Sequence, residues 1–303
     1  VFEELSFAPG KAVNAGLRLE SVKVDSLGGG NNGEGAEFTA DSKKFKPLSA
    51  SVGYRQDMGS GWTATTGLSY TERAPTFYEL YANGMHHATE TYEAGNANNQ
   101  KEKGTTLDLA LTYKTAESKT RLGAFVTEFS NFIGLKDSGE ESDDGDPIYN
   151  FEGIKAHLYG LEADGRFPLL KGVFARSGQI DLSWKADYVR GENRTTGGSL
   201  PRIAPLRLDG ALIYTEGRYS SQLDVRYAAS QNRYDDSLGA TPSYTMVGMG
   251  ASYKTVIQGF KAAYWFVRVD NLTNEVARNA SSVMRDVAMV GSRSLRAGLR
   301  ASF

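Results

Sequence analysis

The 303-residue chain contains no cysteine, only 8 prolines and almost no net charge. Without cysteine it has neither a disulfide framework nor thiol chemistry. The formal net charge of −2 at pH 7 argues against a nucleic-acid binder held by phosphate contacts. No stretch approaches the roughly 20 consecutive apolar residues of a membrane helix. The polar mean hydropathy does not exclude a membrane protein, because only alternate residues of a transmembrane β-strand face lipid.

The chain does contain many segments in which apolar and polar residues alternate. At the carboxyl end, the segment 293–303 places Leu295, Ala297, Leu299, Ala301 and Phe303 on one side and serine, arginine and glycine on the other. Strict period-two alternation can be used only by a strand. The same pattern recurs in several other runs, and no amphipathic helix competes with them. These runs cover residues 48–55, 62–71, 106–113, 179–188, 206–214 and 222–227.

Strand length and side-chain chemistry favour a membrane barrel over the alternative, a soluble β-sandwich or barrel. Many runs reach about 10 residues, the length that a tilted strand needs to cross a bilayer. Aromatic residues, including Trp62, Tyr113 and Tyr188, end the apolar faces, as in the interfacial girdles of such barrels. The charged opposite faces suit a wet interior. We therefore predict an all-β, antiparallel, up-and-down transmembrane barrel in the bacterial outer membrane, in contact with its lipid.

The connections between the predicted strands alternate between short and long, as they do in outer-membrane barrels. Short links are expected at 9–10, 58–60, 115–118, 216–217 and 256–259, and an intermediate one at 169–178. Long links are expected at 26–44, 72–102, 136–147, 191–203, 229–242 and 271–292. This spacing gives about 12–13 strands, whereas a complete bacterial barrel has an even number. We expect residues 1–303 to form a single portion of a larger barrel, with Val1 in mid-barrel.

Several segments resemble TonB-dependent outer-membrane receptors. The segment 72–81 (Glu-Arg-Ala-Pro-Thr-Phe-Tyr-Glu-Leu-Tyr) is similar to the point where a strand of these receptors enters a loop. Segment 98–104 is similar to the return from loop to strand, and segments 200–205 and 270–274 match later positions. The terminal strand ending in Phe303 resembles the signal by which the outer-membrane assembly machinery recognises barrels. Segments 83–89 and 92–96 resemble the subset of receptors associated with zinc and related metals.

This resemblance implies a barrel of about 22 strands closed by an amino-terminal plug. It also implies import driven by the TonB complex through a short box near the amino terminus. We expect the chain to be the carboxy-terminal part of such a barrel, without signal peptide, plug or box. The implied function is uptake of a metal ion or metal chelate. Siderophore, haem, cobalamin and free-metal receptors share the scaffold, and zinc is favoured only by the segment 86–96.

Candidate metal ligands lie in the long link that begins at Glu72. The adjacent His86 and His87 offer imidazole, a common ligand for zinc, nickel or copper. Glu90 and Glu93 could add carboxylate oxygens, as could Glu79. Adjacent residues of an extended segment point in opposite directions, so both histidines need not bind one ion. The alternative is that they are polar loop residues without a ligand role. We expect no resident cofactor, only a metal ion as transient substrate.

Other polar features have simpler explanations. His157 lies in an expected strand without a clear facing or partner, and the acidic run 137–146 lacks the regular ligand spacing of a calcium loop. The charges of the polar faces can pair across neighbouring strands. No nucleophile elbow, phosphate loop or dinucleotide fingerprint is present, which argues against an enzyme. The alternative to a transporter is a passive porin-like pore, or a structural barrel whose outer loops bind other proteins.

Overall fold

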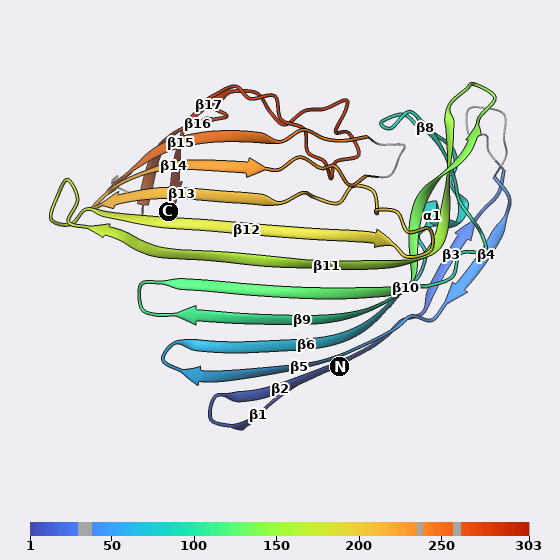
Figure 1. The fold of residues 1–303 in the computed structure, drawn as a ribbon, viewed down its shortest axis with the longest axis horizontal. Helices are drawn as coiled ribbons and strands as arrows, with labels where there is room; N and C mark the ends of the chain where they lie inside the picture. Colours follow the sequence, from blue (N-terminus) through green and yellow to red (C-terminus); the bar gives the residue numbers. More distant parts are fainter. Residues whose placement is uncertain (30–37, 235–238, 257–261, 303) are drawn as a thin grey trace.

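The structure, a computed structural model, describes residues 1–29, 38–234, 239–256 and 262–302. One antiparallel sheet dominates it, in which each strand of the main path pairs with the next along the chain (Figure 1). The strands of this path are β1 (Phe2–Ala8), β2 (Lys11–Leu19), β5 (Leu48–Gly59), β6 (Trp62–Arg73), β9 (Glu102–Lys114), β10 (Lys119–Glu141), β11 (Pro147–Lys171), β12 (Gln179–Asn193), β13 (Arg207–Glu216), β14 (Tyr219–Ala228), β15 (Tyr244–Thr255), β16 (Ala262–Asp270) and β17 (Ser294–Ser302). The predicted fold class is confirmed.

The register places the apolar residues of neighbouring strands on one face. Leu109 of β9 lies opposite Thr66 of β6 and Ala124 of β10, and Ala124 in turn lies opposite Leu161 of β11. Directly opposite residues of paired strands project from the same face of a sheet. Side chains alternate between the two faces along each strand. Leucines that lie an even number of residues from these positions in the same strand are therefore on that face as well.

This apolar face has no second layer over it among the described residues. Figure 1 shows a single curved sheet, with the remaining elements gathered at one end. Leu109, Leu161 and Leu223 keep 50%, 61% and 46% of their surface exposed, values that a soluble core would not show. The few buried apolar residues are mostly alanines. The leucines are therefore not packed against a second sheet or a helix.

The two edges of the sheet are β1 and β17, which do not pair with each other in the part of the chain that the structure describes. The path contains thirteen strands, as the sequence predicts. β1 runs toward the end of the sheet that carries the short turns, and β17 finishes at that same end (Figure 1). The sheet is thus an open portion of a barrel wall.

The short elements lie at the end with the long connections (Figure 1). They are the hairpin β3 (Val22–Ser26) and β4 (Asp41–Phe45), the helix α1 (Phe77–Tyr81), and the hairpin β7 (Asn83–His86) and β8 (Thr91–Ala94). Tyr81 of α1 donates a hydrogen bond to Asp41 of β4 at 3.2 Å, which joins two of these elements. None of the helices in the described residues has the length and apolarity to cross a membrane.

Two of the expected long links are wrong in detail. The expected link 136–147 is largely strand, because β10 continues to Glu141 and β11 begins at Pro147, which leaves a turn of 142–146. The link 26–44 begins and ends within the β3–β4 hairpin. Pairing of β10 with β11 in the main sheet, and of β3 with β4 in a separate sheet, satisfies the backbone in these links, which alternation alone could not indicate. Part of the expected turn at 256–259 and Phe303 lie outside the described residues.

Candidate functional site

The first polar centre at the long-loop end is built around α1. Its cap residue Thr76 accepts a hydrogen bond from the backbone N–H of Glu79, and the Glu79 carboxylate accepts one from the N–H of Thr76 at 2.7 Å. This reciprocal capping box satisfies two N–H groups that a helix start leaves without partners. It fixes where the chain turns after β6.

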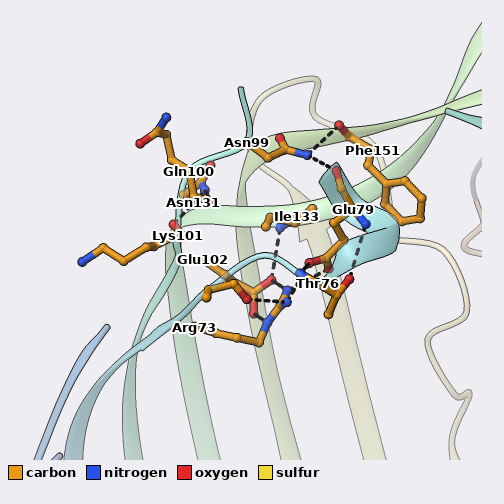
Figure 2. A network of polar contacts seen from close by, with 11 residues as sticks. Arg73, Thr76, Glu79, Asn99, Gln100, Lys101, Glu102, Asn131, Ile133 and Phe151 are labelled. Atoms are coloured by element: carbon orange, nitrogen blue, oxygen red, sulfur yellow. Dashed lines mark hydrogen bonds and ion pairs between the residues drawn. The ribbon is translucent and has the colours of Figure 1, made fainter. Parts of the chain in front are cut away.

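Arg73, the last residue of β6, anchors this helix to the sheet (Figure 2). Its guanidinium donates two hydrogen bonds to Glu79, at 2.8 and 2.9 Å, and two to Glu102 of β9, at 3.0 and 3.3 Å. Glu102 also accepts a hydrogen bond from the backbone N–H of Ile133 in β10. One arginine therefore connects β6, α1 and β9, and through Glu102 also β10.

Asn99 closes the same network from the other side (Figure 2). Its buried side-chain amide donates to the carbonyl of Glu79 at 2.9 Å and to the carbonyl of Phe151 in β11 at 3.0 Å. Nearby, Asn131 donates to the carbonyl of Lys101 at 2.9 Å. These bonds hold the returning segment 95–101 beneath α1 and fix both ends of the 74–101 connection.

The charge state of Glu79 follows from these contacts. Burial alone would raise the pKa of its carboxyl group. The hydrogen bonds from Arg73 and from the Thr76 backbone favour the carboxylate and outweigh burial, so the pKa of Glu79 lies below its ordinary value. Glu79 is therefore an ionised partner of Arg73 and is not available as the metal ligand that the sequence suggested.

The candidate metal ligands lie on the β7–β8 hairpin, which joins the sheet through parallel pairing of β8 with β11. The Nδ1 atom of His86 lies 2.7 Å from the Thr89 hydroxyl and 3.8 Å from a carboxylate oxygen of Glu93. All ring contacts of His86 with other described residues involve Nδ1, which leaves Nε2 available. The structure thus brings His86 and Glu93 together, with the imidazole oriented by Thr89.

His87 and Glu90 are exposed and contact neither of these residues. Glu90 instead lines a cavity of about 240 Å³ between the β7–β8 turn, the long-loop ends of β10 and β11, Arg202 and the segment 282–287. Glu90 and Arg202 both have positive φ, at 52° and 57°. Within the described ranges no three side chains of histidine, aspartate or glutamate converge into a metal-holding group. Of the four candidate ligands, His86 and Glu93 therefore lie together, whereas His87 and Glu90 each lie apart.

The second polar centre is the concave face of the sheet, where arginines and aspartates of different strands pair, all between neighbouring strands except Arg268 of β16 and Asp224 of β14, which pair across β15. The interatomic distances are 2.7 Å for Arg166–Asp181, 2.9 Å for Arg207–Asp187, 2.6 Å for Arg226–Asp209 and 2.9 Å for Arg268–Asp224. Arg296 pairs with Asp270 in the same series. A depression of about 370 Å³ lies against Asp209, Asp224 and Arg268. The predicted pairing of charges across neighbouring strands is present.

The structure also places the two weaker candidates. His157 of β11 lies 3.1 Å from Glu128 of β10, on the same face as Leu161. The acidic run 137–146 forms the tip of the β10–β11 extension, where Asp137 caps the N–H of Gly139 at 2.8 Å. Neither forms a group that could hold an ion among the residues described.

Sequence reasoning missed the Arg73–Glu79–Glu102 cluster. A signal for part of it exists, because Thr76 followed by Glu79 has the spacing of a capping box. The spacing of Glu102 from Arg73 carries no such signal, since the contact arises from pairing of β6 with β9.

Together, the uncovered apolar face, the charged concave face and the alternation of short turns with long connections define a transmembrane β-barrel wall. Comparison with known families agrees. The family model for the β-barrel of TonB-dependent receptors ("TonB dependent receptor-like, beta-barrel") matches residues 3–272. The chain belongs to this family, whose members are outer-membrane transport receptors.

Solved structures of the family have the same fold. The chain is similar to the copper transporter OprC, with a TM-score of 0.81 and 20% identity over 100% of this chain and 47% of that one. It is also similar to the siderophore receptor PirA from Acinetobacter baumannii, with a TM-score of 0.68 and 16% identity over 100% of this chain and 45% of that one. For the ferric enterobactin receptor PfeA from Pseudomonas aeruginosa the TM-score is 0.67 and the identity 19%, over 98% and 43%. The chain thus spans less than half the length of these relatives.

Proposed function

We propose that this chain is barrel wall of a TonB-dependent receptor that takes up a metal ion or small metal chelate across the outer membrane of a Gram-negative bacterium. The observation that carries the proposal is the sheet, which is apolar on one face, charged on the other and matched by the family model over residues 3–272. Its structural relatives include a copper transporter and siderophore receptors. That shared chemistry supports a metal-containing cargo.

In the membrane, the apolar face would contact lipid and the long connections would face the outside. The strand ending at Phe303 would be read by the outer-membrane assembly machinery during insertion. The TonB complex would act through an amino-terminal plug region of the kind that the family resemblance implies. The concave face, with its paired charges, would then line the path around that plug.

For the metal itself we propose zinc, on the resemblance of segment 86–96 to receptors associated with that metal, and the side chains of the β7–β8 hairpin are compatible with it. Nδ1 of His86 is held near Thr89 and Nε2 is available, an arrangement in which one ring nitrogen is oriented while the other can bind a metal. The Glu93 carboxylate lies beside Nδ1, as the Thr89 hydroxyl does, so it would support the orientation of the ring and would have to move to become a second ligand of an ion on Nε2. His87 and Glu90 could join only after a rearrangement of the turn between β7 and β8. An incomplete set of ligands suits a transient landing site better than a structural zinc site, which uses four convergent ligands.

Uptake by living cells tests the proposal. Cells that express the receptor from its natural reading frame should accumulate radioactive zinc, or a labelled iron chelate, only when TonB is present and the inner membrane is energised. TonB-independent uptake would favour the passive porin-like alternative. Absence of uptake for all metals and chelates tried, together with binding of a protein to the outer loops, would favour the surface-binding alternative.

Metal titration of the purified receptor tests the landing site. His86→Ala combined with His87→Ala should weaken zinc binding, whereas His157→Ala should not, because that histidine lies in β11 beside Glu128. Glu90→Gln and Glu93→Gln separate the two carboxylates, and only the second should matter if the observed pair is the site. Unchanged zinc binding in the double histidine variant would remove the site.

A further inference from the structure

We infer that Thr89 and Glu93 keep the proton of the neutral His86 ring on Nδ1, so that Nε2 carries the lone pair through which a metal ion would bind. Thr89 is in this sense a positioning residue, because it acts on the ion only through His86. The inference rests on the landing site proposed above and deepens it, since it names the single ring nitrogen that is open to zinc or a similar divalent ion.

The register of the β7–β8 hairpin brings the residues concerned to one face. His86, the last residue of β7, lies directly opposite Thr91, the first residue of β8. Directly opposite residues project from the same face, and Glu93 lies two residues further along β8 on that face as well. The backbone N–H of Thr89 donates to the carbonyl of His86 at 3.0 Å, which closes the turn. This turn returns the Thr89 side chain to the imidazole ring.

The Thr89 hydroxyl makes three short contacts. Its oxygen lies 2.7 Å from Nδ1 of His86, 2.7 Å from the hydroxyl oxygen of Thr91 and 3.2 Å from the carbonyl oxygen of His86. A hydroxyl donates one hydrogen bond and accepts two, whereas a carbonyl oxygen can only accept. All three contacts are therefore hydrogen bonds only if Thr89 donates to the carbonyl and accepts from both Thr91 and Nδ1. In that arrangement the ring proton is on Nδ1.

The other tautomer of the ring uses these contacts less completely. With its proton on Nε2, the ring would accept at Nδ1 and would take the only proton of the Thr89 hydroxyl, so the contact with the His86 carbonyl would no longer be a hydrogen bond. Thr91 cannot restore it. Its buried hydroxyl has no other hydrogen-bond partner in the part of the chain that the structure describes, so it donates to Thr89 in either case.

Glu93 favours the same tautomer through its charge. A carboxylate oxygen of Glu93 lies 3.8 Å from Nδ1, beyond hydrogen-bond distance, and its side chain is only 17% exposed. A negative charge at this place attracts an N–H group and repels a nitrogen lone pair, and the attraction is stronger where little water surrounds the charge. Thr89 and Glu93 thus act on the same ring nitrogen and in the same direction.

The consequence for metal binding follows from imidazole chemistry. A neutral imidazole binds a metal through its unprotonated nitrogen, and the hydrogen bond at the other nitrogen decides which one that is. The His86 side chain is 44% exposed, and its ring contacts with other described residues all involve Nδ1. Its Nε2 is therefore ready for an ion without a proton transfer or a rotation of the ring.

Nuclear magnetic resonance of the full receptor, free of metal and labelled with nitrogen-15 in its histidine rings, tests the inference. At about pH 9, above the ordinary titration range of imidazole, the spectra distinguish a protonated ring nitrogen from an unprotonated one. A His86→Gln variant identifies the His86 signals by their loss. We expect a protonated Nδ1 and an unprotonated Nε2. A ring with its proton mainly on Nε2 would overturn the inference.

Variants show whether Thr89 and Glu93 hold the proton. Thr89→Val keeps a branched side chain without the hydroxyl, and we expect its ring proton to be shared between both nitrogens. Thr89→Ser keeps the hydroxyl and should keep the proton on Nδ1. Glu93→Gln should raise the fraction of the ring with the proton on Nε2, which gives a second reading if valine disturbs the hairpin. The control is Thr63→Val in β6, because the Thr63 hydroxyl makes no hydrogen bond with other described residues.

An unchanged ring proton in both Thr89→Val and Glu93→Gln would overturn the inference. So would a loss in Thr89→Ser as large as that in Thr89→Val, because the hydroxyl would then not be the cause.

Zinc titration of the same variants connects the ring proton with metal binding. Thr89→Val should bind zinc about 10–100-fold more weakly, the usual cost of losing the hydrogen-bond partner of a metal-binding histidine, whereas Thr89→Ser should bind like the unsubstituted receptor. Equal zinc binding by the valine variant and the unsubstituted receptor would contradict the role of Thr89. Because the spectra are recorded without metal, a receptor that binds no zinc would disprove the landing site, while the proton position would still be measured.

Discussion

The guanidinium of Arg73 and the carboxylate of Glu79 meet at two points, with Nη1–Oε2 at 2.8 Å and Nη2–Oε1 at 2.9 Å. This pair fixes the start of the 74–101 connection, which carries α1, β7 and β8. Lysine cannot reproduce its geometry, because an ammonium group lacks the planar fork of guanidinium. The candidate metal site at His86 and Glu93 lies on this connection. It therefore depends on the Arg73–Glu79 contact, although neither of these two residues belongs to the site.

Arg73→Lys should loosen this connection while the sheet remains intact. The expected loss is about 1–2 kcal/mol of local stability, below the upper range for charged hydrogen bonds because Arg73 is partly exposed. Hydrogen exchange of the amides in segment 77–101 should show faster opening. Arg18→Lys, which alters the exposed pair with Glu20, is the matched control and should leave exchange unchanged. Equal exchange in both variants would show that the Arg73 pair does not hold the connection.

The same contact predicts an acid dependence. The pKa of Glu79 is lower in the folded protein than its ordinary value of 4.5, so the folded state favours the carboxylate. The stabilisation is complete above pH 4.5 and is lost as the pH falls through the folded-state pKa. Glu79→Gln should open the segment more than the unsubstituted protein at pH 7, and the difference should shrink in acid. A difference in exchange that grows in acid would contradict this assignment.

Close backbone approach makes Gly95 a sensitive position. A Cβ atom there would lie 2.4 Å from the Tyr81 nitrogen and 2.5 Å from the Ala82 nitrogen, distances that only backbone movement can relieve. Gly95→Ala should therefore cost about 1–3 kcal/mol, the usual range for overpacking, and should displace α1. Gly210→Ala is the control, since no atom lies within 4 Å of its Cβ position. Urea unfolding in detergent, followed by exchange in segment 77–99, distinguishes the two variants.

An arginine introduced on the apolar face should affect folding differently from an arginine introduced on the concave face. Leu223→Arg introduces a cation on the apolar face, where arginine near the bilayer midplane costs about 2–4 kcal/mol. Gln222→Arg places the same side chain on the concave face, next to Asp224, where Gln222 already donates a hydrogen bond at 3.0 Å. Folding yield into lipid vesicles should fall only for Leu223→Arg. A similar loss for both variants would mean that both faces are equally dry.

The sequence predicted the sheet well because its signal is local. Thirteen strands, their direction and most of the connection pattern follow from period-two alternation and turn residues, as at Glu216–Gly217. The continuation of β10 to Glu141 was missed because its residues are mostly polar and acidic, so apolar and polar side chains do not alternate there. Its pairing with β11 depends on backbone contacts rather than on side-chain hydrophobicity.

The candidate site could be predicted only in part. The proximity of His86 and Glu93 follows from a hairpin whose register places Thr91 opposite His86, and no turn signal in the sequence fixes that register. The turn between β7 and β8 also places His87 and Glu90 away from the pair of His86 and Glu93. The partners of Arg73 come from α1 and from β9, and the contact with β9 becomes visible only when β6 and β9 are paired. Long-range pairing of this kind leaves no local pattern.

The central claim is that alternate side chains of this sheet face lipid and water. The absence of cysteine from the 303 residues allows single cysteines to be introduced from Ser221 to Tyr227 in β14 and labelled with nitroxides. In lipid vesicles, collisions with oxygen should be frequent at 221, 223, 225 and 227, and collisions with a water-soluble nickel complex should be frequent at 222, 224 and 226. If the collision frequencies with oxygen and with the nickel complex rise and fall together along residues 221–227, without alternating from one residue to the next, the membrane barrel is contradicted.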